Sequence, residues 1–417
     1  MFTNDSDFNS SMHSCQGSIG NINFDIPLED MRTTTKGKRV ERPWRSKKKK
    51  SVDLAFSYGR TAQKFDNKEK SGDFSSPYSA DKLIKKSKRV YYCSDTLGFA
   101  IDADGEHRLR ETVFCRDRLC PLCVWRKSIV DVKEISAVFD EYENRYPVGE
   151  SGHMLIAVNL GLQNCKPEML ARDVDLILNG FRRLQQYRSL RDKFIGFFRH
   201  MEFTLNFGEK ITPAMWNKRT SKDGKYNYYK ERGLQIGDAN PWHNTYNPHL
   251  HCIFVVPDNF YDEKVAASSH LQKKYWADLW QKACRLDYEP MIWTERLRRF
   301  GSGKREGKLK LAEFAKYPVK DQSIFSDKLP QVLKDEVVIT LAAALRHRKL
   351  IYYGGILGSL YKELFGKKDP NDMEVDLINI DDEPDINPTV AETITWYKWD
   401  YALSNYFLAV LAHRGED

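Results

Sequence analysis

One stretch decides the fold: Asn247-Pro248-His249-Leu250-His251-Cys252-Ile253-Phe254-Val255-Val256. Its apolar run predicts a buried β-strand, and side chains alternate between the two faces of a strand. His249 and His251 therefore share one face, while Leu250 can enter a core on the other. Two imidazoles that project from one rigid strand provide half of a metal site. The alternative is two unrelated polar residues on the open face of a sheet, because so short a motif also occurs by chance.

A second predicted strand offers a carboxylate to the same site. In Arg199-His200-Met201-Glu202-Phe203-Thr204, alternation puts Glu202 and its even-numbered neighbours on one face. If this strand pairs with the histidine strand in the right register, Glu202 lies beside His249 and His251. The three residues can then hold a divalent cation that keeps open coordination positions. Two imidazoles and a carboxylate suit Mn²⁺, Zn²⁺ or Fe²⁺ better than Mg²⁺. Taken alone, the triad also fits a non-haem iron oxygenase.

A third stretch combines a carboxylate with a phenol: Leu311-Ala312-Glu313-Phe314-Ala315-Lys316-Tyr317-Pro318-Val319-Lys320. A helix is predicted over residues 309–317, so that Glu313 and Tyr317, four residues apart, share a face. A phenol is a poor nucleophile until its oxyanion is stabilised, since its pKa is about 10. Lys316 and Lys320 flank the ring and are expected to assist. Taken alone, the pattern is usually an ordinary helix face, because the chain holds 21 tyrosines.

Four cysteines form a candidate zinc site. Cys115, Cys120 and Cys123 fall within nine residues, and Cys93 lies 22 residues upstream of Cys115. A Cys-x-x-Cys pair with further cysteines has the spacing of a structural zinc knuckle. A redox role is the weaker alternative, because no thioredoxin-like strand precedes the pair. Basic side chains line the cluster, and the ones expected to contact DNA are Arg116, Arg118 and Arg126.

Composition and charge indicate a protein that binds a polyanion. The chain has 417 residues, 41% of them hydrophobic, and a formal charge of +8. Residues 31–50 hold ten Lys or Arg against one Glu, whereas residues 369–385 hold eight acidic side chains and no basic one. Such runs fit DNA contacts or solvated tails. No stretch approaches the roughly 18 apolar residues of a membrane span, and no signal-peptide core is present. We therefore expect a cytoplasmic protein without structural disulfides.

The clusters, in this order, resemble those of the replication initiator proteins of rolling-circle plasmids, within the His-hydrophobic-His (HUH) endonuclease superfamily. The resemblance covers about residues 90–365. It rests on Cys115 to Arg126, on His249-Leu250-His251, on residues 313–320, and on a Gly-Gly turn in Arg346-His347-Arg348-Lys349-Leu350-Ile351-Tyr352-Tyr353-Gly354-Gly355-Ile356-Leu357. Residues Met154–Leu160 stand where the first strand motif of the family falls. They depart from its Thr-rich form, and we assign them no catalytic role.

The resemblance implies a mechanism. Tyr317 would attack a phosphodiester of single-stranded origin DNA, which forms a 5′-phosphotyrosyl link and leaves a 3′-hydroxyl to prime synthesis. A Mg²⁺ or Mn²⁺ ion on His249 and His251, with Glu202 as our choice of third ligand, would act as a Lewis acid. In one branch of the family, a glutamate four residues before the tyrosine activates the water that terminates the reaction, and Glu313 has that spacing. Lys320 would assist the tyrosine.

The expected fold is an α+β domain around an antiparallel sheet, because strand and helix patterns interleave and several long strands are adjacent in sequence. Five segments are predicted. They are a disordered basic N-terminal region (1–88), a zinc module with a helix (89–147), the HUH nicking domain (148–330) with an insertion at 208–246, a C-terminal helical part (331–366), and an acidic linker with a terminal helix near 390–412 (367–417).

The expected partners are origin DNA, single-stranded at the nick, and the host helicase, DNA polymerase and single-strand-binding protein. A dimer is one option that the sequence leaves open. Basic side chains, Lys316 among them, would hold phosphates, and aromatic rings would stack on bases. The candidate stacking residues are Trp242, Tyr246, Trp293 and Phe300, for which core packing is the alternative. Alternative functions are a transposase or relaxase with the same chemistry, and a non-catalytic zinc-dependent DNA-binding regulator.

Overall fold

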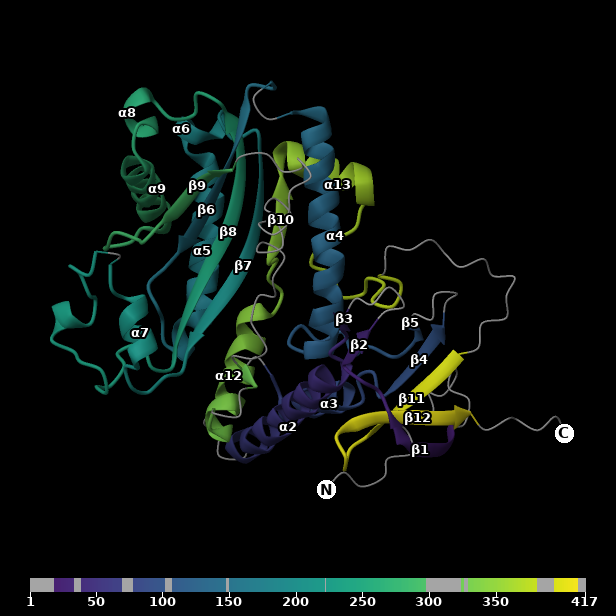
Figure 1. Ribbon diagram of the computed structural model, residues 1–417. Coiled ribbons are helices and arrows are strands. Elements are labelled where there is room, and N and C mark those ends of the chain that lie inside the picture. Colours follow the sequence, from purple (N-terminus) through teal and green to yellow (C-terminus); the bar gives the residue numbers. More distant parts are fainter. Residues whose placement is uncertain are drawn as a thin grey trace. The chain divides into compact units, whose positions relative to one another are not determined.

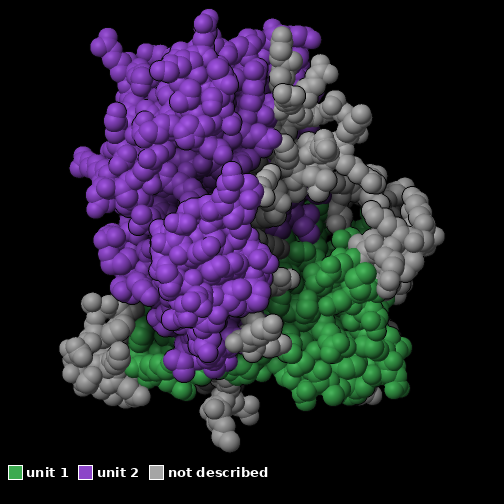
Figure 2. Space-filling view, turned by 60° about the vertical axis from the view of Figure 1, so that its left-hand side comes forward, with its two compact units in different colours: residues 1–127, 373–417 green, residues 128–372 purple. Residues whose placement is uncertain are grey.

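The chain folds into two units, each built around its own antiparallel sheet. Unit 1 comprises residues 1–127 and 373–417, and unit 2 comprises residues 128–372 (Figure 2). The computed structural model describes residues 19–33, 39–69, 78–101, 107–147, 150–221, 223–297, 324–325, 329–380 and 394–411. Within those ranges, no helix has the length and apolar character that a membrane crossing requires.

Unit 1 contains a five-stranded sheet in the order β1-β12-β11-β4-β5, with every neighbouring pair antiparallel. Its strands are β1 (Ile19–Pro27), β4 (Thr96–Ile101), β5 (His107–Glu111), β11 (Ile394–Asp400) and β12 (Asn405–Leu411); a separate hairpin joins β2 (Met31–Thr33) and β3 (Arg39–Glu41). Helices α2 (Trp44–Glu69) and α3 (Ala80–Tyr91) pack against each other (Figure 1). The pairing of β1 with β12 brings the two ends of the sequence into one sheet.

The prediction of disorder for residues 1–88 is wrong over β1, β2, β3, α2 and the part of α3 that it covers, and helix α2 shows why. The buried side chains of this helix recur every three or four residues, which is the pattern of an amphipathic helix. They are Trp44, Lys48, Ser51, Leu54, Ala55, Ser57, Tyr58, Thr61, Ala62 and Phe65. The run Lys47-Lys48-Lys49-Lys50 hides this stripe in the sequence, because only one of its four lysines faces inward.

The terminal helix predicted near 390–412 is also wrong, because β11 and β12 form a hairpin there. Tyr397 and Trp399 are both buried, and their separation of two residues is the period of a strand. Aromatic side chains favour strands over helices. Pairing runs from Trp396 with Ala409 to Asp400 with Asn405. The strand partners β1 and β4 therefore decide the conformation of this segment.

Unit 2 contains a second five-stranded sheet, in the order β10-β7-β8-β6-β9, again antiparallel throughout. Its strands are β6 (His153–Gly161), β7 (Gly196–Asn206), β8 (Thr245–Pro257), β9 (Trp293–Leu297) and β10 (Ile351–Gly354). The three long central strands occupy the positions that the sequence predicted. This arrangement confirms the expected α+β class around an antiparallel sheet.

Helices cover both faces of the unit 2 sheet (Figure 1). On one face, α4 (Pro121–Arg145) and α13 (Gly355–Phe365) supply Phe139 and Leu357 to a core with Phe198 and Ile253. The other face is covered by α5 (Leu170–Gln186) and α9 (Ser269–Cys284). There, Phe254 lies 6.1 Å from Phe181 and 5.0 Å from Trp276, between ring centroids. The remaining helices are α6 (Arg188–Arg191), α7 (Pro213–Lys218), α8 (Glu263–Ala266) and α12 (Gln331–Leu345).

Two segments are organised differently from the prediction. The single helix expected over 262–286 is divided into α8 and α9, and residues 331–366 form no separate part, because β10 belongs to the unit 2 sheet. The insertion at 208–246 connects β7 to β8 and contains α7. The helix expected at 309–317 lies outside the described residues.

The Gly-Gly turn has a steric explanation. β10 pairs with β7, and Gly354 lies so close to Phe197 that a Cβ would be 2.2 Å from Cζ of that ring. Gly355 has φ +57°, and a Cβ there would be 2.3 Å from the carbonyl oxygen of Ile195. Only glycine tolerates such an approach. The turn therefore lets α13 begin directly where β10 ends.

Candidate metal centres

Strand pairing places a carboxylate opposite two histidines in unit 2. In the ladder of β7 and β8, Glu202 is directly opposite His249, and His200 is directly opposite His251. Residues paired in this way project from the same face of a sheet. Glu202 Oε2 lies 2.8 Å from His251 Nε2 and 4.0 Å from His249 Nε2. The structure thus brings together the three side chains that the sequence singled out as metal ligands.

The geometry of this Glu202–His249–His251 triad fits a divalent cation. Each residue offers one ligand atom, and the three atoms lie within 4.8 Å of one another. His249 Nδ1 lies 3.1 Å from the carbonyl oxygen of Asn247. Since a carbonyl only accepts hydrogen bonds, Nδ1 carries the proton and Nε2 is left to bind a metal. The triad side chains are 12 to 17% exposed, so solvent or a substrate oxygen can reach the centre.

The surroundings of the triad favour a cation and leave space for a ligand. His200 is buried, and burial lowers its pKa to about 3, so that its ring stays neutral and does not repel a metal ion. On the opposite side, Gly161 pairs with His249, and a Cβ at Gly161 would lie 3.1 Å from the Cβ of His249. Further along the same face of β8, Ile253 and Val255 are buried in the core. The triad therefore lies where the covered part of the sheet face ends.

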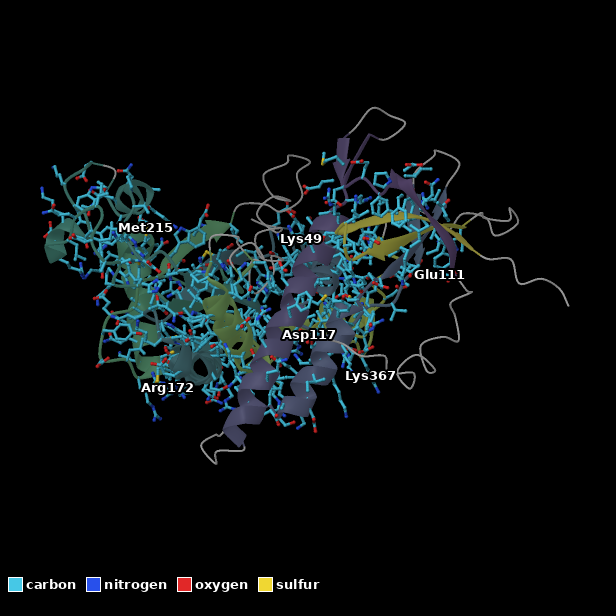
Figure 3. All side chains as sticks on the ribbon, turned by 90° about the horizontal axis from the view of Figure 1, so that it is seen from below. Lys49, Glu111, Asp117, Arg172, Met215 and Lys367 are labelled. Carbon is cyan, nitrogen blue, oxygen red and sulfur yellow. The ribbon has the colours of Figure 1, made fainter. Side chains whose placement is uncertain are left out.

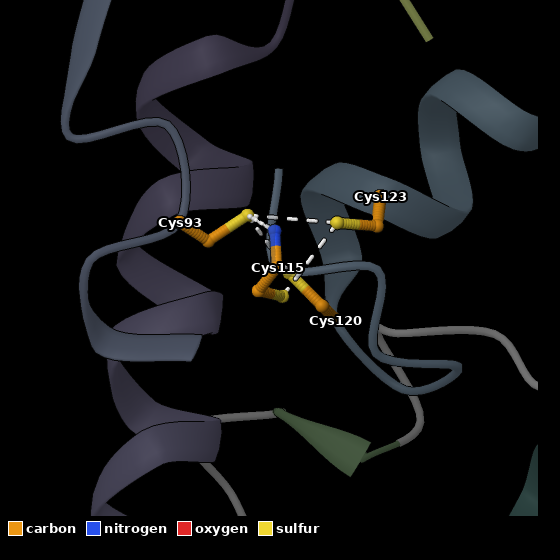
Figure 4. Close-up of side chains that lie close together, drawn as sticks. All are labelled: Cys93, Cys115, Cys120 and Cys123. Atoms are coloured by element: carbon orange, nitrogen blue, oxygen red, sulfur yellow. Dashed lines mark hydrogen bonds between the residues drawn. The ribbon is translucent and has the colours of Figure 1, made fainter. Parts of the chain in front are cut away.

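A second cluster, in unit 1, is formed by the four cysteines (Figure 4). Cys93 Sγ lies 3.5 Å from Cys123 Sγ and 3.6 Å from Cys120 Sγ, and Cys115 Sγ lies 3.6 Å from Cys123 Sγ. A tetrahedral Zn²⁺ with bonds of about 2.3 Å needs sulfur atoms roughly 3.8 Å apart. A disulfide needs about 2.05 Å. The four side chains, 0 to 7% exposed, therefore fit a closed structural metal site.

Helix α2 contributes a buried cation to this cysteine cluster, which the sequence analysis missed. Lys48 is fully buried, and its Nζ donates to the backbone oxygens of Tyr91 (2.7 Å) and Cys93 (2.9 Å). It also lies 3.5 Å from Asp95, a carboxylate that it shares with Lys398. Four thiolates around one divalent ion would carry a net negative charge, which the Lys48 ammonium would offset. The sequence does contain a signal for this contact, because Lys48 lies four residues after Trp44 and three before Ser51, which places all three on one face of a helix.

Ser51 Oγ, which donates to the carbonyl oxygen of Lys47, lies 3.3 Å from Cys120 Sγ. Two backbone groups donate hydrogen bonds to the sulfur atoms: the Cys115 N–H, 3.3 Å from Cys93 Sγ, and the Arg116 N–H, 3.2 Å from Cys123 Sγ. Such donors orient metal-binding thiolates and stabilise their charge. Burial raises the pKa of Cys115 and of Cys123 well above the ordinary value. Metal binding at this cluster must therefore release protons.

Two of the arginines expected to bind DNA are engaged inside unit 1. Arg126, 3% exposed, donates to the carbonyl oxygens of Leu377 and Ile378. Arg116 donates to the carbonyl oxygens of residues 373 and 375 and pairs with Glu374. Because its guanidinium is buried, the prediction of a DNA contact is wrong for Arg126. For the half-buried Arg116 and Arg118 it stays a prediction.

The other predicted residues have different outcomes. Tyr317, Glu313, Lys316, Lys320 and Phe300 lie outside the described residues, so their relation to the triad stays a prediction. Among the candidate stacking residues, Tyr246 is fully buried and belongs to the core. Trp242 packs inside the insertion, 4.4 Å from Tyr228 between ring centroids. Trp293 is 43% exposed.

Comparison with known proteins then gives the family. A family model described as replication protein matches residues 106–407, more than half of the chain. The chain belongs to the replication protein family. It is 30% identical over 376 residues to a protein named Protein rep from Lentilactobacillus hilgardii, and the matched region covers 89% of this chain and 96% of the relative. It is 28% identical over 396 residues to Protein rep from Bacillus amyloliquefaciens, which covers 91% and 97%. No solved structure matches it.

These matches confirm the resemblance to plasmid replication initiators. The part of this replication protein that the family model matches contains three of the four cysteines, the whole triad and Tyr317. It begins after α2 and Cys93, so Lys48 and Ser51 lie outside it. The contacts that Lys48 and Ser51 make at the cysteine cluster are therefore seen in the structure but lie outside the part of the chain that the family model matches.

Proposed function

We propose that this replication protein starts plasmid replication by the rolling-circle mode, by nicking and rejoining origin DNA through a covalent link to Tyr317. The observation that carries the proposal is the triad, with three ligand atoms within 4.8 Å on a partly exposed region of the sheet face. Membership of the replication protein family supports DNA as the substrate. The host helicase, DNA polymerase and single-strand-binding protein would act on the opened origin afterwards.

In the proposed reaction, Tyr317 Oη bonds to the scissile phosphorus as the bond from phosphorus to the 3′ oxygen breaks. The 3′ oxygen takes up a proton and becomes the primer hydroxyl, while the 5′ phosphate stays on the tyrosine. Glu202, His249 and His251 would hold Mg²⁺ or Mn²⁺, whose chemistry is to withdraw charge from a phosphate oxygen. Lys316 and Lys320 are proposed to favour the phenolate of Tyr317.

Termination needs a second attack on the phosphotyrosine. Glu313 is proposed to accept a proton from water, which then displaces the tyrosine and frees the protein. The cysteine cluster is proposed to hold Zn²⁺ in a structural role, which suits four buried thiols with no open position. Arg116 and Arg118 are the remaining candidates of the zinc module for a phosphate contact.

The decisive experiment looks for the covalent intermediate. Purified protein is incubated with Mn²⁺ and a single-stranded origin oligonucleotide, and the products are separated on a denaturing gel. We expect a protein–DNA adduct that Tyr317→Phe abolishes and that His249→Ala lowers by at least about 100-fold, since Lewis-acid stabilisation contributes several kcal/mol. His270→Ala, at an exposed histidine of α9, is the matched control and should keep full activity.

Two outcomes would overturn the proposal. An undiminished adduct in Tyr317→Phe would move the nucleophile to another residue. Binding of the origin without any adduct from the unsubstituted protein would favour the non-catalytic DNA-binding regulator.

A further inference from the structure

We propose that Trp293 is a stacking platform for a base of single-stranded DNA, and that Asn159 contacts the nucleotide held between Trp293 and the triad. The proposal rests on the proposed nicking function and deepens it, because it assigns the path of the DNA strand beside the metal centre. Trp293 is one of the candidate stacking residues predicted from the sequence, whereas Asn159 had no predicted role.

The first argument is the register of three neighbouring strands. His251 on β8 is paired with Asn159 on β6, and Asn159 is paired with Trp293 on β9. Paired residues project from the same face, so these three side chains form one row across the sheet. Adjacent strands are about 4.8 Å apart, which puts the backbone of Trp293 roughly 10 Å from that of His251. This distance corresponds to roughly three nucleotides at the 3.4 Å rise of a stacked strand.

The second argument is the exposure of Trp293. Its side chain is 43% exposed, whereas Trp276 and Trp280 of the same unit are fully buried. Leu297, four residues later on the same face of β9, is 4% exposed and lies in the core. This face of β9 is thus covered at one end and open at the end that adjoins the triad. A large exposed aromatic ring in the same row as an open metal centre is available to stack on a ligand bound there.

The third argument is an unpartnered polar atom between the two sites. Asn159 Oδ1 is buried and has no hydrogen-bond partner among the described residues. Native proteins rarely leave a buried acceptor unpaired, and such groups require an explanation. A nucleotide that lies between Trp293 and His251 carries the donors that this oxygen lacks, on its base. The same amide offers N–H donors to a phosphate oxygen.

The chemistry of the occupant follows from these features. Every nucleobase has a π-face that can stack on an indole ring, and such stacking tolerates any sequence. Gly161, which pairs with His249, has no side chain that would obstruct the DNA strand beside that histidine. A second copy of this chain could also cover an exposed tryptophan, and the experiment separates the two occupants.

The test measures binding to a single-stranded origin oligonucleotide by fluorescence anisotropy, in the Tyr317→Phe background so that no adduct forms. Trp293→Ala is expected to weaken binding by roughly 5- to 150-fold, the range measured for loss of one base–aromatic stack. Trp293→Phe should restore most of the affinity. Met291→Ala, at an 87% exposed side chain two residues before Trp293, is the matched control and should bind normally.

Single abasic sites placed in turn near the nick give a readout that a loss of folding would not produce. We expect one abasic position to weaken binding of the Trp293-containing protein and to have no further effect on Trp293→Ala. Asn159→Ala should weaken binding by a smaller factor than Trp293→Ala.

The outcomes separate this inference from the proposed function. Equal affinity of Trp293→Ala and the parent, with nicking intact in proteins that keep Tyr317, would overturn the stacking role and leave the nicking function standing. Loss of the dimer by Trp293→Ala, with DNA affinity unchanged, would assign the ring to a subunit interface and overturn it too. Weakened binding in Trp293→Ala, together with no adduct from the protein that keeps Tyr317, would uphold the platform and remove the nicking function.

Discussion

The cysteine cluster of unit 1 and the Glu202–His249–His251 triad of unit 2 are two candidate metal centres of opposite design. The cysteines supply four donors and are 0 to 7% exposed, so that a metal there would have no open position. The triad supplies three donors and is 12 to 17% exposed. Closed sites with four donors stabilise folds, whereas sites with three protein ligands leave a position for substrate or water.

The groups around the two centres differ in the same way. Around the cysteines, two backbone N–H groups donate hydrogen bonds to sulfur, Ser51 Oγ lies 3.3 Å from Cys120 Sγ, and Lys48 donates to the carbonyl oxygen of Cys93. Beside the triad, His200 Nδ1 and Asn159 Oδ1 are buried without hydrogen-bond partners in the part of the chain that the structure describes. The first centre is complete within the protein, and the second has polar groups that a substrate can satisfy.

The largest effect is expected from removing a ligand of the cysteine cluster, the closed site of this comparison. Cys120→Ser should lose zinc and the protection of amide hydrogens in α2 and α3, because the binding energy of a structural zinc, on the order of 10 kcal/mol, is folding energy. Protection of β7 and β8 should remain. Metal analysis and hydrogen exchange provide the measurements.

Cys165→Ser is the control for that experiment, because Cys165 is buried in unit 2 and takes no part in the cluster. It should retain zinc and the protection of α2. A Cys120→Ser protein that kept one zinc per chain would show that the ligand set is wrong.

The triad could be predicted because its signals are local. The alternation in residues 247–256 and 199–204 defines two strands, and one assumption, that they pair, brings Glu202 to His249. The assumption holds because both strands are long and apolar on the face away from the site, where Leu250 and Met201 are buried. Four cysteines with zinc-knuckle spacing were equally recognisable.

Other features could not be predicted because they depend on contacts that are distant in sequence. β11 and β12 are strands because they pair with β4 and β1, which lie some three hundred residues earlier or more. Lys48 lies in a run of four lysines, and only the position of the Cys93 carbonyl shows which of them turns inward. The composition of residues 31–50 shows that this segment is basic, but it does not show that α2 packs against α3.

A smaller effect is expected from removing only the Lys48 hydrogen bonds beside the cysteine cluster, with all four cysteines kept. Lys48→Met removes donors to the carbonyl oxygens of Tyr91 and Cys93 and should destabilise unit 1 by roughly 1.5–3 kcal/mol, the range for hydrogen bonds from a charged group. Zinc should then pass to a chromogenic chelator faster than from the parent protein. Urea unfolding gives the free-energy change.

Lys49→Met is the matched control, since the neighbouring Lys49 is exposed on α2 (Figure 3). It should change neither stability nor the rate of zinc transfer. If Lys48→Met and Lys49→Met behaved alike, Lys48 would have no role in holding the cluster.

The smallest effect is expected at the triad, the open site of this comparison, from adding one methyl group beside His249. In Gly161→Ala, the new Cβ would lie 3.1 Å from the Cβ of His249, so the histidine must move by a few tenths of an ångström. Since ligand geometry governs metal affinity, Mn²⁺ should bind a few-fold more weakly, at roughly unchanged stability. Gly208→Ala, whose Cβ would meet its nearest neighbour at 3.5 Å, is the control. An unchanged Mn²⁺ dependence of nicking would mean that the space beside His249 serves neither metal nor DNA, and the two centres would then differ less than their exposure suggests.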